Sequence, residues 1–200
     1  MAFSDFKSIS QVQQEYKIRF VESHFLPEST LEPSPNFLYE LAFSLENLDV
    51  FTSEAARSET IIFPVLREVY KPFANSFSLW IQKAIGFDQA LSGTPDYLIA
   101  TKSELGKTVL ETPLIVVAEA KKNDFQQGWA QCLAELVAAQ KINGNPSRVV
   151  YGVVTDGKLW EFGKLEESTF TKFVQSYTID DLTELFGMLN AILIAARDSL

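Results

Sequence analysis

The sequence is poor in cysteine and histidine, with Cys132 and His24 as the single examples among 200 residues. One cysteine excludes an intrachain disulfide, and a lone histidine is more often a structural or surface residue than a ligand. No apolar run approaches the roughly 18 residues that span a bilayer. Residues 1–10 also lack the basic-then-apolar layout of a signal peptide. We therefore expect a cytoplasmic protein with no membrane segment.

Basic side chains are also scarce, with 17 Lys and Arg against 26 Asp and Glu and a net charge of −9. Because Lys and Arg neutralise phosphates in duplex binding, strong non-specific binding of nucleic acid by an isolated monomer is not expected. The charge is uneven, since residues 101–175 carry nine basic and nine acidic side chains whereas residues 1–100 carry 7 and 13. A metal ion, a dimer or a basic partner would supply the missing positive field.

The length and the 46% hydrophobic content fit a single domain over residues 1–200 with a full core. Apolar spacing and turn residues predict helices over 8–16, 34–47, 53–70, 124–142 and 179–198. They predict strands over 17–25, 73–87, 97–100, 114–120, 149–154, 159–162 and 170–177. The expected fold is α/β, with a central mixed sheet of four or five strands flanked by helices. Its core would span about 54–165, with a helical and strand extension over 1–50.

Residues 94–122 bring together side chains suited to metal chemistry. Asp96 opens one strand of a predicted antiparallel pair, and the apolar partner strand ends in Glu119 and Lys121. Because side chains alternate along a strand, Glu119 and Lys121 share one face, opposite the neighbouring alanines. Two carboxylates are the hard oxygen ligands that Mg²⁺ takes from a protein, with water and phosphate completing its shell. The alternative is that Glu119 and Lys121 form an ordinary ion pair on a solvated sheet face.

The PD at 95–96 and the EAK at 119–121 resemble the signature of the PD-(D/E)XK nuclease superfamily, which has the restriction-endonuclease-like fold. The resemblance covers about 54–163. Within it, the run TDGKLWEFG at 155–163 is similar to a segment of type I restriction-enzyme nuclease domains. The resemblance implies a metal-dependent nuclease that hydrolyses phosphodiester bonds, with DNA expected ahead of RNA as the substrate.

The same resemblance assigns roles to the residues of the motif. Asp96 and Glu119 would bind Mg²⁺ or Mn²⁺, with the backbone carbonyl of Ala120 as a further ligand. Lys121 would orient or deprotonate the attacking water and offset the charge that builds on the phosphate.

Glu59 is expected on the inward side of the 53–70 helix, because it projects near the apolar stripe formed by Ile62, Phe63, Leu66 and Tyr70. A buried carboxylate needs a partner or a metal. Glu59 is therefore either salt-bridged, with Lys121 as one candidate, or it is the helix carboxylate that many members of the superfamily direct at the site, often through a metal-bound water.

Gln131 matches the glutamine of a Q-x-x-x-Y pattern that some branches of the superfamily carry beside the site. The fourth residue on is Glu135 rather than tyrosine, so only Gln131 is carried over. It would either position the site from the far side or bond the backbone.

Two other classes of function stay open from the sequence. The chain is either a catalytically inactive nuclease-fold protein that binds nucleic acid or a protein partner, or a structural dimer component with a salt-bridged sheet face. The intact Asp-Glu-Lys set favours catalysis, and the acidic surface favours binding alone. Because no target-reading module is recognisable, we expect a homodimer or a separate specificity partner.

Overall fold

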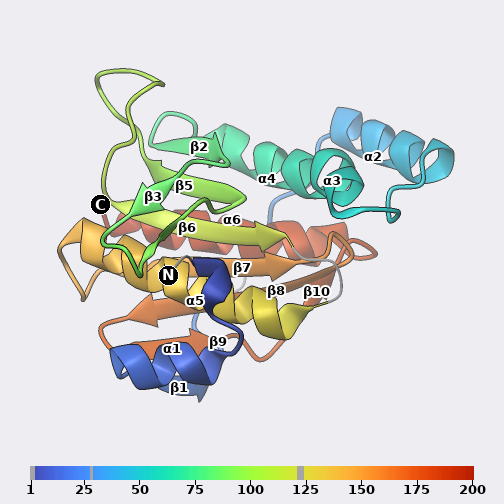
Figure 1. Cartoon of the computed structure of the whole chain (residues 1–200). Helices are drawn as coiled ribbons and strands as arrows, with labels where there is room; N and C mark the ends of the chain where they lie inside the picture. Colours follow the sequence, from blue (N-terminus) through green and yellow to red (C-terminus); the bar gives the residue numbers. More distant parts are fainter. Residues whose placement is uncertain (1–2, 28, 121–123) are drawn as a thin grey trace.

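The computed structural model describes residues 3–27, 29–120 and 124–200. Helices cover both faces of a large mixed sheet (Figure 1). The strands are β1 (Arg19–Glu22), β2 (Phe77–Ile81), β3 (Ile85–Gly86), β4 (Ser92–Gly93), β5 (Tyr97–Thr101), β6 (Leu114–Ala120), β7 (Val150–Thr155), β8 (Leu159–Glu166), β9 (Thr169–Lys172) and β10 (Tyr177–Thr178). The helices are α1 (Ile9–Tyr16), α2 (Pro35–Asn47), α3 (Glu54–Arg57), α4 (Phe63–Tyr70), α5 (Phe125–Asn143) and α6 (Leu182–Asp198), with helical turns η1 (Phe3–Asp5), η2 (Ser58–Ile62) and η3 (Lys71–Phe73).

The main sheet has eight strands, more than the four or five that the sequence predicts. Its order is β1-β9-β8-β7-β6-β5-β2, and β10 pairs with β8 off this path. The pairs β1–β9 and β6–β7 are parallel, and the other pairs are antiparallel. The five strands from β2 to β8 along this path are the predicted centre. The extra strands β1, β9 and β10 have only two to four residues each. β9 follows β8 as a hairpin, whereas β1 joins through pairing with β9 from a distant part of the chain.

The sheet separates two apolar cores, because successive side chains point to opposite faces. On one face, Val117 of β6 belongs to the core that α5 and α1 cover. On the other face, Ala118 and Ala120 belong to the core that α4 and α6 cover. Figure 1 shows α5 in front of the sheet and α6 behind it. The alternation predicted for the end of β6 is therefore confirmed as far as Ala120.

The crossover from β6 through α5 to β7 positions the candidate site. Because β6 and β7 are parallel, with Ala120 opposite Thr155, both strands end at one edge of the sheet. Asp124 begins α5 by accepting a hydrogen bond from the Gln127 N–H, as a helix N-cap does. The predicted antiparallel pairing of β5 and β6 is also confirmed, with Tyr97 opposite Ala118. The start of β5 thus lies at the same edge.

The predicted helix over 53–70 is one helical stretch interrupted by a π-helical turn, η2. The turn ends just before Pro64, whose ring lacks an N–H and would clash with the carbonyl oxygen four residues earlier in a regular α-helix. The helix is therefore disturbed before Pro64 by a widened turn. Its consequence is that residues before and after η2 no longer share the angular positions of a regular α-helix.

Candidate functional site

Asp96 lies directly beside the end of β6. The Ala120 N–H donates a hydrogen bond to Asp96 Oδ2 over 2.9 Å. Pro95 has no N–H, which suits a strand start, and Asp96 follows it at the sheet edge where β6 ends. The structure thus brings together the first and second parts of the PD…ExK pattern, which are separated by 24 residues along the chain.

Glu119 points toward α5 and is 1% exposed. Gln131, on the second turn of α5, donates from Nε2 to Glu119 Oε1 over 2.7 Å. The same Nε2 group lies 3.2 Å from Glu135 Oε1, one helical turn further on. Gln131 therefore bonds side-chain carboxylates, and it links the sheet to the helix at the site.

Glu135 also belongs to this cluster, although it stands where the Q-x-x-x-Y pattern has a tyrosine. Its side chain is fully buried, and no described residue donates to its Oε2 atom. Burial raises the pKa of Glu135 well above its ordinary value, and the charge of Glu119, a carboxyl–carboxyl hydrogen bond with Glu119 and the charge of Asp96 raise it further, against the lowering effect of Gln131. Burial and the neighbouring acids thus favour the protonated form of Glu135. In the sequence, the four-residue spacing from Gln131 to Glu135 indicates that both side chains lie on one side of the helix.

Another acid, Glu161 of β8, lies on the same face of the sheet as Glu119 and forms an ion pair with Lys172. Glu119 and Glu161 both pair with Val154, from opposite sides of β7. Glu161 Oε2 accepts from Trp129 Nε1 over 2.6 Å and lies 2.9 Å from Lys172 Nζ. Because Trp129 and Lys172 already bind its carboxylate, we do not count Glu161 among the candidate metal ligands.

Glu59 is exposed, so the prediction that it lies on the buried stripe is wrong. The physical reason is the π-helical turn that contains it, since the wider turn rotates Glu59 away from the apolar side chains of α4. Glu59 is nonetheless close to the start of β5. Burial, together with the charges of Asp96 and Glu59, raises the pKa of Tyr97, although a hydrogen bond to the Ser58 carbonyl opposes the shift. Glu59 thus lies on the α4 side of the sheet edge that carries Asp96.

Lys121, predicted to act beside Glu119, lies outside the described residues. Within the described chain, no group of three or more His, Cys, Asp or Glu side chains is arranged to hold a metal ion. Two carboxylates and a carbonyl still fit Mg²⁺ or Mn²⁺, because Mg²⁺ is usually held by one or two protein carboxylates and keeps several waters. Asp96 and Glu119 both contribute to the raised pKa of Glu135, after the larger effect of burial, so three acids lie near one another here. The donor set therefore fits a divalent cation.

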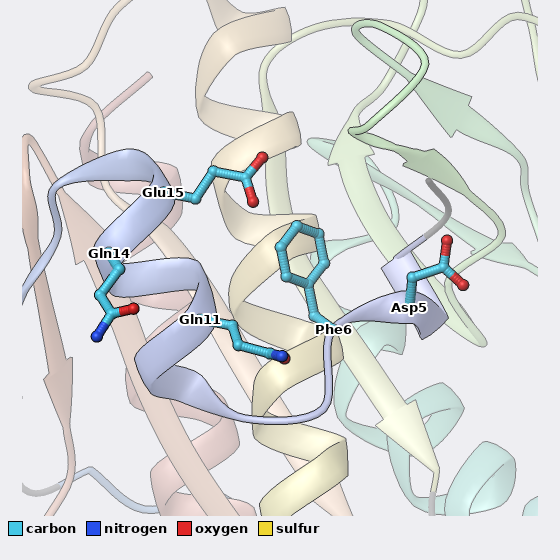
Figure 2. Close-up of a pocket in the computed structure, with 5 residues that line it drawn as sticks. All are labelled: Asp5, Phe6, Gln11, Gln14 and Glu15. Atoms are coloured by element: carbon cyan, nitrogen blue, oxygen red, sulfur yellow. The ribbon is translucent and has the colours of Figure 1, made fainter.

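Two surface cavities lie elsewhere on the molecule. Figure 2 shows the one beside α1, of about 390 Å³, with Phe6 between the Glu15 and Asp5 carboxylates. Its Gln11 amide oxygen already accepts the N–H groups of Lys7 and Ser8 in the cap of α1. The other cavity, of about 370 Å³, lies between α6 and the segment at 24–30. The residues lining these two cavities include none of the site acids.

Every helix of the described chain is too short or too polar to cross a membrane. The sequence matches no family model, and no curated protein is similar enough in sequence to be matched. Among solved structures, the chain is similar to the type IIG restriction endonuclease BpuSI, with a TM-score of 0.40 and 12% identity over 68% of this chain. The chain spans 15% of the length of that protein. This likeness is too distant to carry an argument about activity, so the chemistry of the site rests on its own residues.

Proposed function

We propose that the chain is a metal-dependent nuclease that hydrolyses phosphodiester bonds, with DNA as the expected substrate. The observation that carries this proposal is that Asp96 lies against the end of β6, where Gln131 links Glu119 to the buried Glu135. Acids held together in this way lower the stability of the folded chain, because like charges at short range repel one another, and such clusters are typical of functional sites. A bound divalent cation offsets that repulsion.

Each residue of the candidate site has a distinct role in this proposal. Asp96 and Glu119 would hold Mg²⁺ or Mn²⁺, which when bound polarises the phosphate and lowers the pKa of a coordinated water. Gln131 fixes the orientation of the Glu119 carboxylate through its 2.7 Å hydrogen bond. Lys121 would stabilise charge on the phosphate, and Glu59, exposed at the same edge, would accept protons or hydrogen bonds from water.

The first test is calorimetric titration of the full chain with Mg²⁺ and Mn²⁺, in parallel with cleavage of short duplex and single-stranded DNA and RNA. We expect Asp96→Ala and Glu119→Ala to abolish both metal uptake and cleavage. Lys121→Met should keep metal binding and lower the cleavage rate by about 100-fold or more, as the loss of one stabilising charge does.

The matched control is Glu104→Ala, which removes an exposed carboxylate from the loop at the opposite end of β5 and β6. This variant should bind metal and cut like the native chain. Metal uptake and cleavage that stay unchanged in Asp96→Ala would overturn the proposal. If the native chain bound DNA in a salt-sensitive way and cut none of the substrates with either metal, the acidic surface would favour the non-cutting binding protein instead.

A further inference from the structure

Helix α2 carries an apolar surface that the rest of the described chain leaves uncovered. Only Phe37 and Leu41 of this helix are buried. The large apolar side chains that follow one another around its outer side are 41% to 67% exposed. We call them the α2 patch: Leu38, Tyr39, Phe43, Leu45 and Leu48. Figure 1 shows α2 at the margin of the molecule, beyond α3 and α4.

The patch consists of two apolar groups on the helix surface. Tyr39 and Phe43 are four residues apart and therefore neighbours. Leu38 and Leu45 lie next to the buried stripe, about 100° or more around the helix from Tyr39, and Leu48 is the C-cap of the helix. Single exposed apolar side chains are ordinary, but five large ones are exposed here and only two side chains of the helix are buried. Such a concentration of exposed apolar side chains is typical of a protein interaction site.

The charge around the patch is of one sign. From Arg19 to Arg57 the sequence has no lysine or arginine between these two residues, and it has seven acidic side chains there. Glu40 and Glu46, each three residues from Phe43, flank the patch and are exposed, as is Asp49 just after the helix. A partner that covers the patch must therefore bring positive charge to its rim.

We propose that the α2 patch binds a protein partner through a basic segment that also presents apolar side chains. A second copy of this chain fits poorly, because a symmetric contact would place Glu40, Glu46 and Asp49 against the same acids of the partner copy. Nucleic acid is a polyanion and is repelled by the same rim. An anionic membrane surface is excluded on the same ground, because helices that lie on membranes carry lysine and arginine on their polar face.

This inference does not depend on the nuclease proposal. If both hold, the partner would bring cationic charge beside the site, because α2 packs against η2, which carries Glu59. The scarce basic charge of the chain would then be supplied in trans.

The test uses a fluorescein-labelled synthetic peptide of about 18 residues, with leucine at every third and fourth position and lysine elsewhere. A second peptide has glutamate in place of each lysine. Fluorescence anisotropy with the full chain should show binding of the lysine peptide that weakens as salt is raised, and binding of the glutamate peptide at least about tenfold weaker.

Two double variants separate the patch from the overall acidity of the chain. Tyr39→Ser with Phe43→Ser removes apolar surface and keeps the charge, whereas Glu40→Gln with Glu46→Gln removes charge and keeps the apolar surface. Because all four side chains are exposed, both variants should fold, with unchanged circular dichroism. We expect each to bind the lysine peptide at least about fivefold more weakly, as truncation of central contacts does.

The matched control is Leu105→Ser, which removes a side chain that is 79% exposed in the loop between β5 and β6. It should bind like the native chain. Equal binding by the native chain and both double variants would overturn the proposal, since the peptide would then adhere to the acidic surface at large. A dimer of the native chain alone, seen by sedimentation and lost in Tyr39→Ser with Phe43→Ser, would overturn it in favour of a second copy.

Discussion

At the scale of single residues, the site depends on how Gln131 separates and orients two carboxyl groups. Its Nε2 group lies within hydrogen-bonding distance of both Glu119 and Glu135, at 2.7 and 3.2 Å. Burial and the charge of Glu119 favour the protonated form of Glu135, and in that form Glu135 can donate a hydrogen bond within the cluster. The hydrogen bond from Gln131 thus holds Glu119, one of the proposed metal ligands, in one orientation.

The buried acid gives the folded chain a specific pH dependence. Because the pKa of Glu135 is raised above its ordinary 4.5 in the folded chain, the folded state keeps a proton that the unfolded state releases. The free energy of unfolding should therefore fall as the pH rises from about 4.5 through the folded pKa. Glu135→Gln retains an amide donor and does not titrate, so this fall should be smaller in the variant than in the native chain.

Urea unfolding of both proteins from pH 4 to pH 9, in buffer with a metal chelator, measures this difference. Glu104→Gln serves as the control, because Glu104 is exposed and distant from the cluster. Parallel pH profiles for the native chain and Glu135→Gln would contradict a raised pKa of Glu135 in the folded chain.

At the scale of secondary-structure elements, the relative position of α5 and β6 decides whether Gln131 reaches Glu119. At the far end of α5, Asn143 fixes that position. Its Oδ1 accepts the Leu114 N–H over 2.7 Å, and its Nδ2 donates to the Leu114 carbonyl over 2.8 Å. The amide side chain thus pairs with β6 as a neighbouring strand would, at the start of the strand that ends in Glu119.

Asn143→Ala should lower the free energy of unfolding by about 1–3 kcal/mol, because both backbone groups of Leu114 lose their partner. Asn143→Asp keeps the acceptor but places a carboxylate against the Leu114 carbonyl, so it should be at least as damaging at pH 7 and recover part of its stability at acid pH. Thermal unfolding with circular dichroism at pH 7 and pH 4 measures both effects. Equal stability of the aspartate variant at the two pH values would contradict a direct contact.

The elements that the sequence predicts well are those with local signals. The cap at Asp124, the end of α5 at Gly144 and the antiparallel pair around Asp96 all follow from residue types within a few positions. The position of Glu59 is predicted wrongly, because a helical projection assumes a regular α-helix throughout. No residue pattern in the sequence indicates that the chain forms the π-helical turn η2 before Pro64. Glu135 is recognisable as a neighbour of Gln131, but its burial depends on how α5 packs across the sheet.

At the scale of the whole molecule, the width of the sheet depends on contacts that no local pattern encodes. The strand at 17–25 and the last strand are each predicted, yet their membership of the main sheet requires Arg19 to lie opposite Thr169 in a parallel pair. Such non-local pairing is fixed by the packing of the whole chain rather than by strand propensity. The N-terminal part also adds buried side chains to the α5 core: Phe3, Phe6, Val12 and Ile18.

A matched pair of variants at Arg19 tests whether the paired strands β1 and β9 unfold in the same cooperative unit as the site. The Arg19 N–H donates to the Ser168 carbonyl over 2.8 Å, and the Arg19 side chain is exposed. Arg19→Pro removes that donor and should lower the free energy of unfolding by about 2–3 kcal/mol, whereas Arg19→Ala keeps it and should change stability by less than about 0.5 kcal/mol. Urea unfolding followed by circular dichroism and by tryptophan fluorescence should give one coincident transition for each protein. Trp129 packs against Phe170 of β9, so its fluorescence reports on the β1–β9 part of the sheet. Two separate transitions, or equal stability of the proline and alanine variants, would instead make the N-terminal strand an accessory that the site does not need.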